Sequence, residues 1–219
     1  MTALAGVGFD LREGEVLGLI GPNGSGKTTL MAGLAGLLPL DAGEVRFQGR
    51  PLRAGARPEG LFYLPDGIAP WPEQPLRGVA QLWDDLLGVE PGAVAQACAE
   101  LDLGRLMDRA MGHLSKGERK RALLAVALAA PHPLLLLDEP FDGLDPRQTL
   151  AAMAQVRAKA QAGRTLLLSI HQLGDAARVC DRLVLLDAGR RVGEGDLTQL
   201  RQQAGLPQGS LEEVFLALT

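Results

Sequence analysis

The amino-acid sequence predicts an α/β fold with a mostly parallel sheet core, and two observations predict it. Three apolar runs, at 134–137, 165–170 and 183–186, are continuous and bounded by turn residues, which is typical of strands buried on both faces. Segments with helical periodicity lie between these runs, and strands interleaved with helices favour helices packed on both faces of one sheet.

The first elements of the chain fit the same plan. Residues 15–20 indicate a short apolar strand, and residues 27–38 a helix that follows a glycine-rich turn. Residues 41–43 break that helix, and residues 44–48 alternate polar with apolar side chains, as a half-buried antiparallel strand does. We therefore expect a small N-terminal antiparallel β-subdomain.

The remaining segments are mainly helical. Residues 67–130 read as an inserted α-helical subdomain, and residues 196–219 as a C-terminal helical tail. In that tail, Leu211, Val214, Phe215 and Leu218 lie at the spacing of an amphipathic helix packed on the core. A chain of 219 residues without repeats or low-complexity linkers indicates a single domain, 1–219.

Composition and charge restrict the function classes. The longest apolar stretch, 122–137, is interrupted by Pro131 and Pro133, so it falls short of the ~20 residues that cross a bilayer. The first residues do not resemble a signal peptide, so we expect a cytoplasmic chain. A net charge of −4 argues against a nucleic-acid partner, and the basic run 119–121 is expected to be a solvated helix face.

The two cysteines and two of the three histidines do not belong to any recognisable motif. Cys98 and Cys180 lack the paired spacing of zinc or redox sites, so they are expected to be free thiols. His113 and His132 are expected to be structural or exposed.

A phosphate-binding loop is the first motif that carries chemistry. Residues 21–28 fit G-x-x-x-x-G-K-[ST] between a predicted strand and a predicted helix, which is the context that this loop requires. Backbone N–H groups and the helix N-terminus attract phosphate, Lys27 supplies a cation for the β- and γ-phosphates, and the Thr28 hydroxyl is a Mg²⁺ ligand. The predicted nucleotide-binding residues are Gly21, Pro22, Asn23, Gly24, Ser25, Gly26, Lys27, Thr28 and Thr29.

Two carboxylates end the apolar run at 134–137. Asp138 and Glu139 are expected at the carboxyl edge of the sheet, where ligands of α/β proteins bind. Asp138 is predicted to hold Mg²⁺ through water, and Glu139 to orient or deprotonate an attacking water. An acidic turn before Pro140 is the alternative interpretation of the same residues.

Two further features accompany the acidic pair. Ser115 and Glu118 form a predicted capping box at a helix start, and a helix start with a small Ser and Gly is also an anion site. His171 follows the run at 165–170, so it too is expected at the carboxyl edge, within reach of a phosphate.

In this order, GPNGSGKTT at 21–29, LSKGE at 114–118, LLLLDEP at 134–140, GLDP at 143–146 and SIH at 169–171 resemble an ABC (ATP-binding cassette) ATPase. The match covers almost the whole chain. The resemblance implies a P-loop NTPase that binds ATP and Mg²⁺.

The resemblance also implies a partner and residue roles. Two nucleotide-binding subunits, identical or different, would form a head-to-tail dimer, and each ATP would be held in trans by Ser115, Lys116, Gly117 and Glu118 of the other chain. Glu139 would be the catalytic base, with Lys27 and His171 contacting phosphate, and Asp145 would link the two chains.

A membrane partner follows from the same resemblance. The chain would be a motor at the inner face of the cell membrane, attached to an integral permease subunit through the residues near 64–66. The closing segment is similar to ATPases of ABC-2-type exporters, so we expect export. A non-transport ABC ATPase and a nucleotide-dependent regulatory clamp are the alternatives.

This sequence departs from the family pattern at a few positions. Asp66 stands where the family usually carries a Gln, and it is a candidate Mg²⁺ ligand. Lys116 and Glu118 replace the commonest Gly and Gln of the signature. Phe9 and Tyr63 lie at the wrong motif positions for the adenine-stacking aromatic of the family, so we expect weak discrimination between ATP and GTP.

Overall fold

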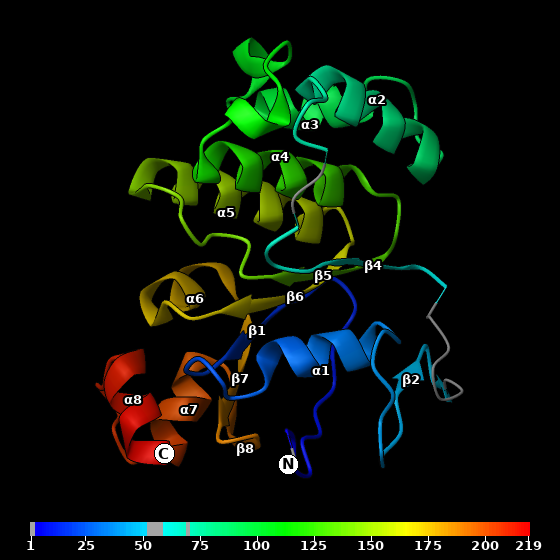
Figure 1. The fold of residues 1–219 in the computed structure, drawn as a ribbon. Helices are drawn as coiled ribbons and strands as arrows, with labels where there is room; N and C mark the ends of the chain where they lie inside the picture. The colour runs from blue at the N-terminus through cyan, green and yellow to red at the C-terminus, as the bar shows by residue number, and fades with distance from the viewer. Residues whose placement is uncertain (1–2, 52–58, 69–70) are drawn as a thin grey trace.

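A six-stranded sheet forms the centre of the computed structural model, which describes residues 3–51, 59–68 and 71–219 (Figure 1). Its strands are β1 (Val16–Ile20), β4 (Leu61–Leu64), β5 (Leu134–Asp138), β6 (Thr165–Ile170), β7 (Arg182–Asp187) and β8 (Arg190–Gly195). The order across the sheet is β4-β5-β6-β1-β7-β8, with parallel pairing everywhere except between β7 and β8. The predicted α/β fold with a mostly parallel sheet is confirmed.

A two-stranded hairpin represents the predicted antiparallel β-subdomain within the described residues. It pairs β2 (Arg46–Phe47) with β3 (Arg50–Pro51). Gln48 and Gly49 join the strands with φ of 50° and 75°, as a type I′ turn requires. The strand expected at 44–48 is therefore shorter than predicted, because the turn begins at Gln48.

Eight α-helices are described, and most lie where the periodicity placed them. They are α1 (Lys27–Leu34), α2 (Leu76–Leu87), α3 (Ala93–Glu100), α4 (Lys116–Ala129), α5 (Pro146–Gln161), α6 (Leu173–Val179), α7 (Leu197–Gln203) and α8 (Leu211–Leu218). The expectation of a helix over 27–38 is wrong at its end. Gly36 adopts a left-handed φ of 71° after α1, which ends the helix and leaves Leu37 and Leu38 exposed.

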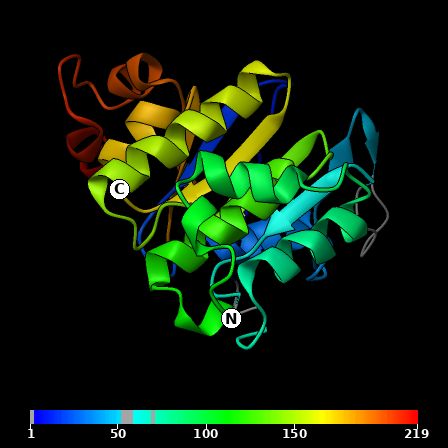
Figure 2. The same cartoon turned by 90° about the horizontal axis from the view of Figure 1, so that it is seen from above.

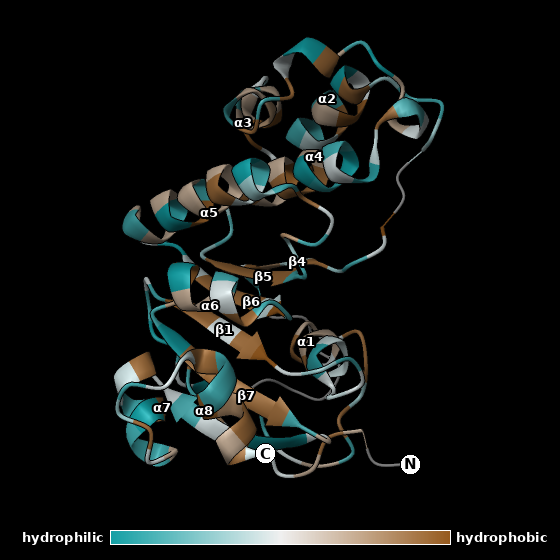
Figure 3. Ribbon diagram, turned by 90° about the vertical axis from the view of Figure 1, so that its left-hand side faces the viewer, coloured by the Kyte–Doolittle hydropathy of each residue, from teal (hydrophilic) through white to brown (hydrophobic). Residues whose placement is uncertain are grey.

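The alternating side chains of the strands divide the core between the two faces of the sheet. Leu17 and Leu19 of β1 pack with Leu30 and Met31 of α1 on one face. Val16 of β1 belongs to the larger cluster that the other helices complete. Figure 3 shows the central strands as the most hydrophobic part of the molecule, as expected for strands buried on both faces.

The helical segment lies over one face of the sheet, where α2, α3 and α4 pack on one another (Figure 2). Two short 3₁₀ helices, Gly104–Leu106 and Met111–His113, connect α3 to α4. The buried carboxylate of Asp84 in α2 accepts hydrogen bonds from the backbone N–H groups of Gly92 and Val94, at 2.7 and 2.9 Å. This contact fixes the start of α3 against α2.

The C-terminal helices pack beside the edge strand β8, which the sequence did not predict as a strand. Leu211 and Val214 of α8 are buried, so the amphipathic pattern of the tail is explained by packing on the core. None of the described helices is long and apolar enough to span a membrane. The thiols of Cys98 and Cys180 are free, as expected.

Candidate active site

Three adjacent strands bring the predicted phosphate loop, the acidic pair and His171 to one edge of the sheet. β1, β6 and β5 are neighbours, and their register pairs Ile20 with Ile170 and Asp138 with Ser169. The loop follows Ile20, Glu139 follows β5 and His171 follows β6. These motifs, which are separated in the chain, therefore meet at the carboxyl edge, where they were expected.

The phosphate loop is tightly packed at its start and folded around its own lysine. A Cβ on Gly21 would lie 2.3 Å from the carbonyl oxygen of Leu186 and 2.5 Å from Ser25 Oγ, so this position has no space for a side chain. Lys27 is 6% exposed, and its Nζ donates to the carbonyl oxygen of Gly21 at 2.8 Å and approaches that of Pro22 at 3.3 Å. The ammonium thus lies in the centre of the loop, bound to backbone oxygens.

The rest of the loop offers polar atoms to its surroundings. Gly24 and Gly26 have φ of 85° and 101°, and Gly26 begins α1 without a side-chain cap. Ser25 is buried, and its Oγ has no hydrogen-bond partner among the described residues. The other predicted binding residues of this loop, Pro22, Asn23, Thr28 and Thr29, are exposed or half-buried. The unpaired groups at this helix start suit an anion.

Asp138 is a buried carboxylate, and one of its oxygens has no hydrogen-bond donor among the described residues. It is 1% exposed, and Ser169 Oγ donates to its Oδ1. Its Oδ2 has no hydrogen-bond partner within the described part of the chain. Burial, together with the neighbouring Asp138 carboxylate, raises the pKa of the Tyr63 phenol. A buried acceptor oxygen without a donor is costly, which indicates that this atom has a ligand to bind.

Glu139 contacts both of the other predicted catalytic residues. Its Oε2 binds His171 Nδ1, and its Oε1 lies 3.8 Å from Lys27 Nζ. The backbone of Glu139 is left-handed, with φ of 52°, and its N–H donates to Ser169 Oγ at 2.9 Å. Ser169 therefore orients both acids, since it binds the side chain of Asp138 and the backbone of Glu139.

The signature segment forms the start of α4. Ser115 and Glu118 make the predicted capping box: Ser115 N–H donates to Glu118 Oε2 at 2.7 Å, and Glu118 N–H to Ser115 Oγ at 3.2 Å. This hydrogen bond from Ser115 lowers the pKa of the Glu118 carboxyl. Gly117 packs closely on the turn after Glu139, because a Cβ there would lie 3.0 Å from the carbonyl oxygen of Gly143.

Lys116 reaches across this contact to Asp142. Its Nζ lies 2.7 Å from Asp142 Oδ2, and Asp142 Oδ1 lies 3.9 Å from His171 Nε2. The hydrogen bond from Lys116 lowers the pKa of Asp142. A line of polar side chains therefore joins the start of α4 to His171 and Glu139 within one chain.

Asp66 is placed differently from the other candidate metal ligands. It follows β4, is half exposed, and its Oδ1 is 2.5 Å from Lys120 Nζ of α4. Its role as a Mg²⁺ ligand stays a prediction. Asp145 caps α5 through Gln148, whose N–H donates to its Oδ1 at 2.8 Å.

The expectation that the basic run 119–121 is a solvated face is wrong. Arg121 is 5% exposed and its Nη1 donates to the carbonyl oxygen of Leu101 at 2.6 Å, while Lys120 binds Asp66. Arg119 Nη1 donates to the carbonyl oxygen of Leu114. These cations are used to hold α4 against its neighbours.

Sequence reasoning missed two residues of the site. Ser169 lies within the SIH motif, but its bonds to both acids depend on the register of β5 and β6. Asp142 lies between two recognised motifs, and only the fold brings it to Lys116 and His171. A small cavity of about 10 Å³ beside Glu139, Asp142 and His171 has room for a single water.

Comparisons with known proteins agree with this geometry. A model of the ABC transporter family matches residues 4–142. The chain is 37% identical to a hemin import ATP-binding protein of Streptomyces coelicolor, over 97% of this chain and 77% of that protein. It is 34% identical to a Nod factor export ATP-binding protein of Burkholderia orbicola, over 87% of this chain and 64% of that protein.

A solved structure agrees as well. It is described as the ATP-binding subunit of an ABC transporter, and it superposes with a TM-score of 0.83 at 29% identity. The superposition covers 99% of this chain and 92% of that one.

Proposed function

The chain belongs to the ABC transporter family, and on that premise we propose that it is a motor subunit which hydrolyses ATP between two subunits to drive a separate membrane permease. Membership makes it an ATP-binding subunit of a transporter and an ATPase. The proposal adds the roles of its residues, its partners and the direction of transport. The observation that carries it is the contact of Glu139 with both His171 and Lys27 at the phosphate loop.

Phosphate recognition is assigned to the loop and its lysine. The triphosphate of ATP offers oxygens that replace the carbonyl oxygens of Gly21 and Pro22 as partners of Lys27. Gly24 and Gly26 supply the left-handed backbone that shapes the loop, and the start of α1 directs N–H groups toward the phosphate. The nine residues from Gly21 to Thr29 are the proposed cradle.

Magnesium fits the residues beside this cradle. The unpaired Oδ2 of Asp138 and the hydroxyl of Thr28 are hard oxygen ligands, which Mg²⁺ prefers together with water and phosphate oxygens. No cluster of three or more acidic, histidine or cysteine side chains that suits a metal occurs among the described residues. When bound, Mg²⁺ neutralises phosphate charge; Asp138 and Thr28 are assigned to it, and Asp66 is a further candidate.

Glu139 is the proposed base for the attack of water on the γ-phosphorus. Its carboxylate accepts the proton of the water, the new P–O bond forms, and the bond to the bridging oxygen of ADP breaks, which releases ADP and phosphate. Ser169 holds the backbone of Glu139, so its carboxylate starts from a fixed position. His171 withdraws from Glu139 to contact the γ-phosphate, and Lys27 balances the negative charge of the transferred group.

A second nucleotide-binding subunit completes each proposed site. Ser115 is exposed at the open start of α4, where the partial positive charge of the helix suits an anion presented by another chain. The capping box leaves this role available. It uses the N–H groups of Ser115 and Glu118 and one lone pair of Ser115 Oγ, so the N–H groups of the residues between them are not used by the box. We assign Ser115, Lys116, Gly117 and Glu118 to the partner's ATP.

A membrane permease is the other proposed partner, which would place the chain at the cytoplasmic face of the membrane. Apolar side chains are exposed on the segment after β4 and on α2: Ile68 and Trp71 are 41% and 53% exposed, and Leu82 and Leu86 are 37% and 64% exposed. Leu82 and Leu86 lie one turn apart on the same face of α2. Exposed apolar groups of this kind favour contact with another protein.

Export remains the proposed direction, and it has its own test. The similar proteins include import and export subunits, and packing on the core explains the pattern of α8. The test uses liposomes that carry the complex with this subunit facing outward. Export predicts that ATP accumulates a transported probe inside the liposomes, whereas release of enclosed hemin on addition of ATP would contradict it.

The function is tested by measuring the Mg²⁺-dependent ATPase rate against protein concentration. Because each site uses two chains, we expect the rate to rise faster than linearly in the wild type. Glu139→Gln removes the base but keeps the cradle, so it should reduce kcat by at least about a hundredfold while a fluorescent ATP analogue still binds.

Lys27→Met is the matched variant, since it should abolish binding as well as turnover. A rate strictly proportional to protein concentration would argue against the two-chain site. Full activity of Glu139→Gln would remove Glu139 from the proposed chemistry.

A further inference from the structure

Asp142 lies between the two parts of the chain that would serve two different nucleotides. Lys116 is at the start of α4, which the proposed function directs toward the partner's ATP. His171 and Glu139 lie beside the chain's own phosphate loop. Asp142 Oδ2 accepts a hydrogen bond from Lys116 Nζ at 2.7 Å, and Asp142 Oδ1 lies 3.9 Å from His171 Nε2.

We propose that Asp142 is a positioning residue of a relay, Lys116–Asp142–His171, through which ATP bound by the partner activates Glu139 of this chain. The proposal rests on the proposed function, because it needs a dimer in which α4 faces the partner's ATP. It deepens that function by naming the residues that make hydrolysis at one site depend on the other.

Steric contacts make the Lys116–Asp142 pair specific. Gly143 has φ of 76°, and a Cβ there would lie 3.1 Å from Cδ of Lys116, so the lysine stem packs directly on this glycine as it crosses the turn. Gly117 packs on the same turn. The start of α4 and the turn after Glu139 are therefore in contact through backbone and side chain alike.

Exposure makes the pair breakable. The side chain of Lys116 is 71% exposed, and those of Asp142 and His171 are 33% and 37% exposed. An exposed ion pair is weak, so it acts poorly as a structural tie. A γ-phosphate that arrives at the start of α4 carries more negative charge than Asp142 and competes for the same ammonium.

Withdrawal of Lys116 changes the surroundings of His171. Asp142 then loses its hydrogen bond to Lys116, and its remaining neighbour in the relay is His171 Nε2, 3.9 Å from Oδ1. Attraction of the imidazole toward Asp142 loosens the contact between His171 Nδ1 and Glu139 Oε2, which is the first step of the withdrawal of His171 toward the γ-phosphate. Glu139 is thereby released from His171 at the moment when both nucleotides are in place.

Mixed dimers test the relay. One chain carries Glu139→Gln, so that only the other chain hydrolyses ATP. Asp142→Asn in the hydrolysing chain should lower kcat by about tenfold, with binding of a fluorescent ATP analogue within about twofold of the parent, because the base is misplaced but the cradle is intact. Asp142→Asn in the Glu139→Gln chain should lower the rate much less than it does in the hydrolysing chain, because the Glu139→Gln chain has no base for the relay to activate.

Homodimers supply the second measurement. The Hill coefficient of ATPase activity for ATP should fall from above 1 in the wild type to about 1 in Asp142→Asn, and Asp142→Glu should restore much of it. The double variant Lys116→Met/Asp142→Asn should reduce cooperativity no more than either single variant does, because each single change already breaks the same relay. Arg77→Met removes an exposed ion pair with Asp108 and is the control that should keep wild-type cooperativity.

Two results would overturn the relay while the motor function stands: equal slowing from either chain of the mixed dimer, or unchanged cooperativity of Asp142→Asn. Failure of the wild type to form ATP-dependent dimers would instead refute the proposed two-chain function.

Discussion

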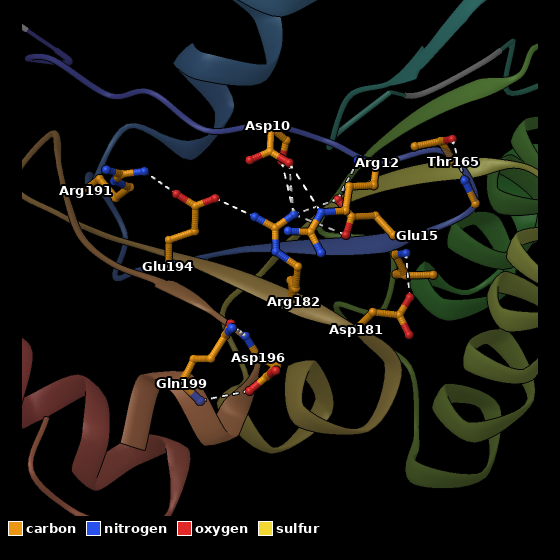
Figure 4. Close-up of polar contacts among 12 residues, drawn as sticks. Asp10, Arg12, Glu15, Thr165, Asp181, Arg182, Arg191, Glu194, Asp196 and Gln199 are labelled. Atoms are coloured by element: carbon orange, nitrogen blue, oxygen red, sulfur yellow. Dashed lines mark hydrogen bonds and ion pairs between the residues drawn. The ribbon is translucent and has the colours of Figure 1, made fainter. Parts of the chain in front are cut away.

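Arg182 is the residue on which three carboxylates of different segments converge (Figure 4). Its Nη1 lies 3.1 Å from Glu15 Oε1 and 3.4 Å from Asp10 Oδ2, and its Nη2 lies 2.6 Å from Glu194 Oε1. The side chains of Arg182 and Glu15 are only 10% and 9% exposed. Arg182→Met should therefore lower the free energy of unfolding by about 3 kcal/mol, since it leaves a buried carboxylate without its cation.

Urea unfolding at pH 7 measures this effect, and Arg12→Met is the control. The side chain of Arg12 is 67% exposed, and its ion pair with Asp10 Oδ2, at 3.5 Å, is also exposed. Its replacement should therefore lower the free energy of unfolding by less than about 1 kcal/mol. Equal losses in the two variants would show that burial of Glu15 is unimportant.

Gly21 is the residue at which the phosphate loop tolerates no side chain. Gly21→Ala places a methyl group 2.3 Å from the carbonyl oxygen of Leu186, so the loop must shift. We expect a loss of about 1–3 kcal/mol in stability, as in other overpacked sites, and nucleotide binding weakened at least about tenfold. Gly8→Ala is the control, because nothing lies within 4 Å of its added methyl group; similar nucleotide affinities in both variants would contradict the argument.

Helix caps are the features of single elements that the sequence predicts best. The Ser115–Glu118 box was predicted from its spacing alone, and the same arrangement begins α5, α7 and α8. A cap is local, so four consecutive residues suffice to specify it. The length of α1 depends on Gly36, and the use of the basic run 119–121 depends on distant partners such as Leu101 and Asp66, which no local pattern reveals.

Glu118 makes the cap of α4 sensitive to pH. Its pKa is lowered in the folded chain, chiefly by the N–H of Ser115, so its contribution is present above the unfolded pKa and is lost as pH falls through the folded pKa. At pH 7 the free energy of unfolding of the wild type should exceed that of Glu118→Gln by about 0.5 kcal/mol, because the glutamine amide still caps the helix but carries no charge. Urea unfolding from pH 7 to 3 should show this difference shrink as pH falls below the unfolded pKa of about 4.3. A difference that stays constant over this range would exclude the charge of Glu118 as its cause.

Over the whole molecule, the sequence predicts the location of the site better than its internal contacts. Buried parallel strands end at one edge, so the motifs that follow them had to meet there. Register across β5 and β6 is a tertiary property, and it alone places Ser169 beside both acids. The contact of Lys116 with Asp142 similarly requires α4 to lie against the turn after β5, so it was not foreseen. The edge strand β8 was missed because its charged residues do not form an apolar run.

Nucleotide binding should stabilise the whole fold, because the phosphate loop, β5 and β6 meet at a single ligand. In Glu139→Gln, which retains ATP, MgATP at a hundredfold excess over its Kd should add about 2.7 kcal/mol and raise Tm by about 5–10 °C. Lys27→Met should show little or no rise of Tm in MgATP. A rise equal to that of Glu139→Gln would mean that the nucleotide binds away from the loop. If two chains enclose the nucleotides, Tm in MgATP should also increase with protein concentration, whereas Tm without nucleotide should not. A Tm in MgATP independent of protein concentration would argue against a site enclosed by two copies of this chain.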